Sequence, residues 1–313
     1  MKTLVFSGGV GGARFLTGLV KVINPADITV ISNTGDDCEF YNLYICPDID
    51  IVIYTLAGEV DPVTGWGIEN DSFHTLAELS KFGCDTWFQL GDRDLATHLY
   101  RSMLIRQGMN LTDITSRIVQ AKGLSLSILP MSNQRVETMI DTGSEILPFQ
   151  EYMVKRRFQT PVSKILFRGA ENASPTQEVL EIIRQAEQII LAPSNPYVSI
   201  GAILAVPGIR RALEQAPGKI AAISPIVGAR AIKGPAALML QAFGRPVSPV
   251  GIAGLYRDFL DIMVVDEQDA FHIPEIEAMG IHTAAADTMM ISLEAKMALA
   301  KRILDISRHM NSD

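Results

Sequence analysis

Short apolar runs alternate along the chain with segments in which apolar residues recur every three or four positions. The first pattern is typical of buried strands and the second of amphipathic helices. The apolar runs predict strands at 3–7, 27–32, 85–90, 124–130, 188–193, 219–226 and 261–266. The helical period predicts helices at 13–23, 71–83, 94–108, 111–123, 174–186 and 292–309. This alternation predicts an α/β fold, a doubly wound, mostly parallel Rossmann-like sheet with helices on both faces.

Glycines and one capping sequence mark several of the predicted helix ends. Three of the helices end at a glycine, as is common at helix C-termini: Gly83, Gly108 and Gly123. At the start of the segment 174–186 we expect Ser174 as the N-cap and Pro175 at the first helical position. Gln177 completes the pattern of a capping box.

The rhythm changes between residues 135 and 173. Residues 136–154 carry β-forming arms around an Asp-Thr-Gly-Ser turn at 141–144, which predicts a β-hairpin. We therefore expect a nucleotide-binding α/β core made of residues 1–134 and 174–313. A small accessory lobe, residues 135–173, is inserted into it.

Composition excludes several classes of protein. The chain has 313 residues, of which 48% are apolar and 20% charged, and its formal net charge is −8. Without a Lys/Arg-rich block, nucleic acid is not an expected partner, because such binding rests on neutralising phosphates. A phosphorylated small molecule, which needs only a few donors, stays possible.

The same sequence predicts a cytoplasmic protein without a membrane partner. We find no apolar run of the roughly 20 residues that a bilayer requires. The N-terminal apolar run gives way to glycines after four residues, which is too short for a signal peptide. The three cysteines, Cys38, Cys46 and Cys84, have no paired spacing, so we expect buried thiols rather than disulfides or a zinc site.

A glycine-rich segment follows the first predicted strand. Gly8, Gly9, Gly11 and Gly12 allow close approach of a ligand, and the helix that follows favours an anion at its N-terminus. The Gly-Lys-Ser/Thr ending of a P-loop is absent, and Arg14 stands where a dinucleotide fingerprint has its last Gly or Ala. We predict a phosphate-binding turn, without naming the nucleotide.

Two pairs of aspartates lie within a short window. Asp36 and Asp37 follow the strand at 27–32 and are either turn residues or ligands of Mg²⁺, which binds oxygen ligands shared with substrate phosphates. Asp48 and Asp50 precede an apolar stretch, where one acid is explained by capping. Four acids are more than caps require, so a functional role is favoured for Asp50.

Two further clusters lie near predicted strand ends. Asp92, Arg93 and Asp94 stand at a predicted helix start, where capping, a buried ion pair and a phosphate clamp are all open, and His98 is more typical of a structural histidine. Trp87 lies just before them, and either core packing or stacking on a flat ring suits it.

Hydroxyl and amide side chains follow the later strands. Ser194 and Asn195 lie between two prolines, and Ser224, Gly228 and Lys233 follow the strand at 219–226. These groups suit a base or a phosphate, although Lys233 equally fits a surface lysine. Carboxylates, glycine loops and a few cations favour metal-assisted phosphoryl or phosphodiester transfer.

Taken together, these motifs resemble the 2-phospho-L-lactate transferase family of coenzyme F(420) biosynthesis. The resemblance rests on GGVGGARFL (8–16), NTGDD (33–37), PDIDIVIYTLAG (47–58), GWG (65–67), WFQLGDRDLATH (87–98), LPMS (129–132), APSNPYVSI (192–200) and SPIVGARAIKGP (224–235). The motifs occur in order over nearly the whole chain.

The resemblance implies a reaction and its partners. A 2-phospho-L-lactyl or phosphoenolpyruvyl group would move from a guanosine diphosphate adduct to the ribityl hydroxyl of the deazaflavin Fo, releasing GMP and forming the F(420)-0 precursor. The family also implies Mg²⁺ as cofactor and a homodimer. The sequence does not distinguish the two cargoes.

The resemblance also assigns residues. Asp50 and Asp36 would be catalytic, and Asp36 and Asp37 would hold Mg²⁺. The acceptor would contact Asp50, Gln89, Trp87, Asp92 and Arg93. The donor nucleotide would contact Gly8, Gly9, Gly11, Gly12, Ser194, Asn195, Ser224, Gly228 and Lys233.

Two alternatives stay open at this point. The first loop and the SPIVG segment also resemble UDP-sugar-binding regulators of carbon metabolism, which would bind a nucleotide sugar without turnover but lack the WF-x-LGDRDLATH block. A nicotinamide-dependent oxidoreductase is less favoured, because the dinucleotide fingerprint is broken.

Overall fold

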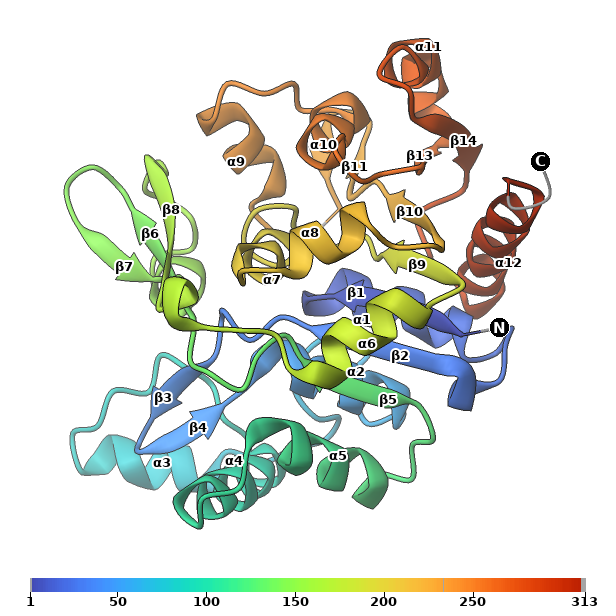
Figure 1. Cartoon of the computed structure of the whole chain (residues 1–313). Coiled ribbons are helices and arrows are strands. Elements are labelled where there is room, and N and C mark those ends of the chain that lie inside the picture. The colour runs from blue at the N-terminus through green and yellow to red at the C-terminus, as the bar shows by residue number, and fades with distance from the viewer. Residues whose placement is uncertain (1, 233, 311–313) are drawn as a thin grey trace.

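A parallel sheet forms the centre of the protein in the computed structural model, which describes residues 2–232 and 234–310 (Figure 1). Within these ranges the sheet has seven strands in the order β14-β13-β10-β9-β1-β2-β5. Their bounds are β1 Thr3–Ser7, β2 Ile28–Ser32, β5 Ser127–Pro130, β9 Gln188–Leu191, β10 Lys219–Ile223, β13 Ile262–Asp266 and β14 His282–Ala286. Every pairing between them is parallel.

The order of the strands reverses beside β1. The chain builds outward from β1 through β2 to β5, then returns to the other side of β1 with β9 and builds outward again to β14. Phe6 of β1 is in register with Ile31 on one side and Leu191 on the other. Such a reversal leaves a crevice at the carboxyl ends of the two central strands, where open α/β sheets bind ligands.

Helices cover both faces of the sheet, as the alternation of apolar runs predicts. One face packs against α1 (Gly9–Leu19), α2 (Pro47–Leu56), α5 (Leu111–Ala121) and α12 (Leu293–Met310). The other packs against α6 (Gln177–Gln185), α7 (Ile200–Ala205), α8 (Ile209–Glu214) and α10 (Pro249–Tyr256). Side chains of β1 alternate between the faces, with Val5 in the first core and Leu4 and Phe6 in the second. The doubly wound fold is confirmed.

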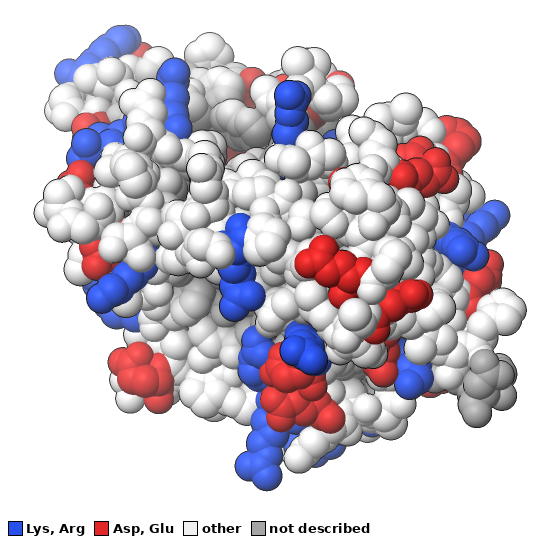
Figure 2. Space-filling view, turned by 90° about the horizontal axis from the view of Figure 1, so that it is seen from above, with Lys and Arg blue, Asp and Glu red and all other residues white. Residues whose placement is uncertain are grey.

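The remaining helices are α3 (His74–Lys81), α4 (Asp92–Arg106), α9 (Ala236–Ala242) and α11 (Ile273–Glu277). Leu104 of α4 joins the first core, and Leu240 of α9 and Ile276 of α11 join the second. Short helical turns occupy Pro25–Asp27, Glu151–Lys155, Ala170–Asn172 and Glu267–His272. Seen from above, acidic and basic side chains lie interspersed over the surface (Figure 2). A search of the described residues for a membrane-spanning helix finds none.

Three small antiparallel sheets accompany the central one in the described ranges. One lies in the insert, with β6 (Glu137–Asp141) between β7 (Ile146–Pro148) and β8 (Lys164–Arg168). The others pair β3 (Cys38–Phe40) with β4 (Leu43–Ile45), and β11 (Ile226–Val227) with β12 (Arg230–Ala231). The β6–β7 pair confirms the predicted hairpin. It stands apart from the helical layers, at the end of the sheet that carries the glycine segment (Figure 1).

The predicted strand at 85–90 is wrong, because this segment is an irregular loop. Its apolar side chains do not join the central sheet. Trp87 and Phe88 pack on Phe40, with ring centroids 5.0 and 5.4 Å away, and Leu90 is buried in a small satellite cluster with Leu43. A short apolar run indicates burial, and here a satellite cluster supplies the burial that a strand would otherwise have found in the sheet.

The predicted N-cap of α6 is also wrong. The helix begins at Gln177, two residues later than expected, and its N-cap is Thr176. The Thr176 hydroxyl accepts a hydrogen bond of 3.2 Å from the backbone N–H of Val179. Pro175 therefore precedes the helix, and the side chain of Gln177 bonds Glu181 within it.

This cap can be tested by paired substitutions. Thr176→Ala should lower the free energy of unfolding by about 1 kcal/mol, because it leaves a helix-terminal N–H without its side-chain acceptor. Ser174→Ala, at the position that the sequence favoured, should change it by less than about 0.5 kcal/mol. Urea unfolding of both variants measures the difference, and equal losses would contradict the assignment.

Candidate active site

The glycine segment after β1 forms the first turn of α1 rather than a separate loop. Gly8 is the N-cap, and in the described residues the first turn carries no acidic side chain. The N–H of Gly8 donates to Ser194 and that of Gly9 to the Asp48 carboxylate. The N-terminal end of a helix favours a negative group, and Asp48 lies at this end of α1. Gly9 has φ +67°, and a Cβ there would have one neighbour within 4 Å, an Asp48 oxygen at 3.9 Å. The positive φ therefore favours glycine at position 9, and the missing side chain leaves open space there.

The other three glycines are required by internal packing. A Cβ at Gly11 would lie 2.3 Å from the carbonyl oxygen of Pro193, and one at Gly12 would lie 2.1 Å from the hydroxyl of Ser7. At Gly8 it would lie 2.6 Å from the Cβ of Ser199. These contacts bring the start of α1 directly against the segment that follows β9.

Residues after β9 and β10 line the same end of the sheet. Ser194 accepts a hydrogen bond of 3.0 Å from the N–H of Gly8. Asn195 holds its own turn, since its side-chain oxygen accepts from the N–H of Tyr197. The Ser224 hydroxyl bonds the backbone of Ile226.

The N–H of Gly228 donates to the carboxylate of Asp269, which ties the β11–β12 hairpin to the segment after β13. Lys233, the remaining predicted nucleotide contact, lies outside the described residues.

Four aspartates are buried between the crevice and the accessory lobe. Asp36 and Asp37 follow β2, while Asp48 and Asp50 lie in the first turn of α2, and each is at most 7% exposed. Asn33 connects the two pairs, because its side-chain nitrogen donates to Asp48 (2.8 Å) and its oxygen accepts from the N–H of Gly35 (2.7 Å). The predicted acids are thus brought together.

Burial disfavours the ionised form of three of these carboxylates. It raises the pKa of Asp36 well above its usual range, and the charge of Asp48 adds to the effect. Burial likewise raises the pKa of Asp37, against opposing hydrogen bonds and the charge of Arg101. Asp48 has its pKa raised to about 6 by burial, although Asn33 and the Gly9 N–H donate to it.

These carboxylates fit a divalent cation. Asp36 Oδ1 and Asp37 Oδ1 are buried and have no hydrogen-bond partner among the described residues. The buried hydroxyls of Ser7, Ser32 and Thr34 also lack a partner there. A cation would satisfy both oxygens and favour the charged forms. The described part of the chain holds no cluster of three or more His, Cys, Asp or Glu side chains suited to a metal. Mg²⁺ bound here would therefore share oxygens of a substrate, as it commonly does.

Asp50 differs from its neighbours, because an arginine holds it. Both oxygens of Asp50 bond the guanidinium of Arg101, one of them at 3.0 Å from Nη1. Arg101 is fully buried in α4. Burial works against its charge, but the carboxylate of Asp50 outweighs this and raises the pKa of Arg101.

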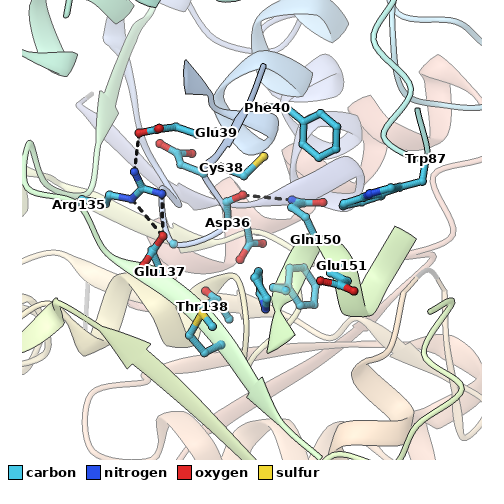
Figure 3. A pocket seen from close by; sticks show the side chains of 15 residues that line it. Asp36, Cys38, Glu39, Phe40, Trp87, Arg135, Glu137, Thr138, Gln150 and Glu151 are labelled. Atoms are coloured by element: carbon cyan, nitrogen blue, oxygen red, sulfur yellow. Dashed lines mark hydrogen bonds and ion pairs between the residues drawn. The ribbon is translucent and has the colours of Figure 1, made fainter. Parts of the chain in front are cut away.

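A pocket of about 200 Å³ opens beside Asp36 and Asp37 (Figure 3). Aromatic rings of Phe40, Trp87 and Phe149 line it. Its other lining residues are Gly35, Cys38, Glu39, Arg135, Glu137, Thr138, Met139, Pro148, Gln150 and Glu151. The accessory lobe thus forms one wall, and the β3–β4 hairpin with the Trp87 loop forms the other.

Of the residues predicted for the acceptor, the pocket lining includes Trp87 and not the others. Gln89 is exposed and donates to the carbonyl of Thr86. Asp92 accepts hydrogen bonds from the N–H groups of His74 and Thr75, which caps α3.

The Arg93 side chain donates to the carbonyl of Glu69. Asp50 is buried behind the pocket, outside its lining. The roles of these residues stay predictions.

Sequence reasoning did not assign Asn33, Arg101 and Gln150 to the site. Gln150 of the lobe donates to the carbonyl of Asp36 (3.2 Å), as Figure 3 shows. Arg101 carried a usable signal, because it follows Asp94 and His98 at the i, i+4, i+7 spacing of one helix face.

Fold and site together define a doubly wound α/β protein with a cluster of buried carboxylates at the carboxyl end of its sheet. The comparisons with known proteins place it within that class. The sequence profile described as 2-phospho-L-lactate transferase CofD matches residues 3–301, and the chain belongs to this family of transferases.

Two relatives and one solved structure illustrate the similarity. A phosphoenolpyruvate transferase of Streptomyces griseus is 41% identical over the full length of both chains. A 2-phospho-L-lactate transferase of Methanosarcina mazei is 39% identical, covering 96% of this chain and 99% of the relative. The fold resembles a Bacillus halodurans protein of the UPF0052 family, with a TM-score of 0.63, 18% identity, and coverage of 96% of this chain and 98% of the other.

The raised pKa of Asp48 predicts a pH dependence of stability. A carboxyl group with a raised pKa binds its proton more tightly in the folded state, so stability falls as pH rises from about 4 through about 6. A shift from 3.8 to about 6 corresponds to about 3 kcal/mol. In metal-free buffer, the melting temperature of the parent should fall more steeply over this range than that of Asp48→Asn. Parallel curves would show that Asp48 does not carry the effect.

Proposed function

We propose that the protein transfers a 2-phospho-L-lactyl or phosphoenolpyruvyl group from a guanosine diphosphate adduct to the ribityl hydroxyl of the deazaflavin Fo, releasing GMP, in coenzyme F(420) biosynthesis. One observation carries the proposal: four buried carboxylates lie near the start of α1, and two of them line an aromatic-walled pocket. A donor diphosphate and a flat acceptor would meet at the carboxylates. The relatives, named for the two cargoes, motivate the choice of donor.

The donor would occupy the crevice between β1 and β9. The N-terminal end of α1 suits the diphosphate, and Gly9 leaves it room. The diphosphate would replace Asp48 as the partner of the Gly9 N–H. Ser194 and Asn195 after β9, and Ser224 and Gly228 after β10, would surround the nucleoside. Among these groups, Ser194 already bonds Gly8, so it would shape the turn as well as face the ligand.

The acceptor ring would occupy the pocket. Trp87 and Phe40 meet edge to face, with ring planes at 86°, and they offer the apolar surface that a flat heterocycle stacks on. Lys155 of the lobe lies 5.6 Å from the centroid of Trp87, which fixes that ring from the lobe side. The ribityl chain would extend from the ring toward the carboxylates.

The carboxylates would divide the chemistry. Asp36 and Asp37 would hold Mg²⁺, which when bound would offset charge on the diphosphate and on departing GMP. Asp50 would accept a hydrogen bond from the attacking ribityl hydroxyl and take up its proton as the new P–O bond forms. Phosphoryl transfer depends mainly on positioning and charge stabilisation, which is what such buried, fixed groups supply.

An assay with defined substrates tests the function. The protein, Fo and Mg²⁺ are combined with guanosine diphospholactate or with the diphosphoenolpyruvate adduct, and mass spectrometry follows GMP release and the deazaflavin product. Product from either donor supports the transferase, and the relative rates identify the cargo. Nucleotide binding without product from either donor would favour a non-catalytic nucleotide-sugar-binding regulator. A homodimer and a cytoplasmic location remain predictions, the former open to sedimentation analysis.

Asp36→Asn should raise the Mg²⁺ concentration for half-maximal activity by about tenfold, because a neutral amide is a weaker ligand for Mg²⁺ than a carboxylate. Glu151→Gln is a matched control, since it removes a charge from the pocket wall supplied by the lobe. Magnesium titrations of the parent and both variants measure the effect. Superimposable curves for Asp36→Asn and the parent would remove Asp36 from the metal site.

Trp87→Ala should raise KM for Fo by about tenfold, corresponding to about 1.4 kcal/mol of lost ring packing. The KM for the donor should stay unchanged, because the crevice is a separate part of the site. Trp66→Ala serves as control, since Trp66 is 48% exposed and lies outside the pocket lining. Steady-state kinetics measures KM for Fo and for the donor in the parent and both variants. Equal changes in KM for Fo in Trp87→Ala and Trp66→Ala would place the acceptor elsewhere.

A further inference from the structure

Two helices face each other behind the carboxylate centre with polar side chains in their interface. Asp50 and Tyr54 lie one turn apart on α2, while Asp94, His98 and Arg101 lie on one face of α4. The Tyr54 hydroxyl donates to Asp94 (2.8 Å), and His98 Nε2 lies 3.1 Å from the same carboxylate. These side chains form a chain of close polar contacts that ends at Asp50, although His98 Nε2 lies near Asp94 without hydrogen-bond geometry.

Arg101 makes the contact with Asp50 through both ends of its guanidinium. Nη1 and Nη2 donate to the two different oxygens of the carboxylate. Two parallel hydrogen bonds fix the plane of a carboxylate, which a single bond does not. Nη1 also lies 3.3 Å from His98 Nδ1 and 3.4 Å from the carbonyl oxygen of Tyr44. These two groups hold the guanidinium in its position.

Stability alone is a poor explanation for this arrangement. Arg101 is 0% exposed and Asp50 is 4% exposed, so both charges have left water. Buried ion pairs recover their desolvation cost only partly, and well-packed apolar side chains are often as stable. In this pair Asp50 can still accept a hydrogen bond from another group, because each of its oxygens keeps a lone pair that Arg101 does not occupy.

We propose that Arg101 is a positioning residue: its two-ended contact fixes the Asp50 carboxylate in the orientation that receives the acceptor hydroxyl, and His98 and Asp94 hold Arg101 in place. The inference rests on the proposed function, in which Asp50 meets that hydroxyl. Arg101 does not touch the substrate in this scheme. Its charge also faces Asp37 and favours the ionised form of that neighbour.

Four variants test the proposal. Arg101→Met removes the charge and keeps a long apolar side chain, whereas Arg101→Lys keeps the charge but not the two-ended geometry. Asp50→Asn and the double variant Asp50→Asn/Arg101→Met complete the cycle, and the double variant leaves no buried charge unpaired at this position. Lys219→Met is the matched control, because it removes another cation that is paired with an acid, Asp261, away from this network.

We expect Arg101→Met to lower kcat by about 100-fold, the scale of a small misplacement in a reacting group. KM for the donor and the Kd for GDP should stay within about twofold. Arg101→Lys should recover part of the loss, to about tenfold below the parent. The double variant should be no slower than Asp50→Asn, because residues that act as a unit are not additive. Lys219→Met should leave kcat unchanged.

Other outcomes overturn the proposal. If kcat of Arg101→Met or Arg101→Lys stays within threefold of the parent, Arg101 does not position Asp50. If the double variant is slower than Asp50→Asn by the full Arg101 effect, Arg101 acts independently of Asp50. Should Arg101→Met fail to fold, Arg101→Lys and the double variant carry the test. A parent protein inactive with both donors would instead reject the proposed function.

Discussion

The site depends on the cost of burying negative charge. Four aspartates are withdrawn from water at one end of the sheet: Asp36, Asp37, Asp48 and Asp50. The guanidinium of Arg101 bonds one of them, Asp50. Burial therefore raises the pKa of the acids that lack this partner, and two carboxylate oxygens stay without a hydrogen bond. A protein retains buried carboxylates without cationic partners where a cationic ligand or a polar substrate completes the site.

The sheet topology explains why the buried carboxylates gather at this place. Parallel strands bring their carboxyl ends to one edge, and the reversal beside β1 keeps helices from covering that edge at the β1–β9 crevice. The segment after β2 and the first turn of α2 both lie at this edge, so four acids that are up to 14 positions apart in sequence converge there. Gly8, Gly11 and Gly12 are part of the same construction, because a side chain at any of them would push α1 away from the strands beside it.

The parts of this structure that follow from local pattern were predictable, and those that depend on packing between elements were not. Continuous apolar runs of strand length predicted the parallel core, and the acids could be placed at its edge because strand ends meet there. The run at 85–90 was misassigned, since periodicity shows burial without showing what buries it. Thr176 and Ser174 are chemically near-equivalent as caps, and helix entry geometry decided between them. The Asp50–Arg101 contact joins two helices 51 residues apart, which no local rule reports.

The accessory lobe extends this construction beyond the central sheet. It leaves the chain after β5 and returns before α6, yet it contacts the acidic segment directly, because Thr138 donates its N–H to the carbonyl of Gly35 (2.6 Å) and Gln150 reaches the carbonyl of Asp36. Both of these contacts end on backbone carbonyls, and an ion pair of 2.7 Å between Arg135 of the lobe and Glu39 of β3 adds a third attachment. The lobe therefore closes one side of the pocket and brings charged side chains of its own, Arg135, Glu137 and Glu151, to that wall. The wall from the lobe and the acids after β2 are thus held together by short contacts between segments about 100 residues apart in sequence.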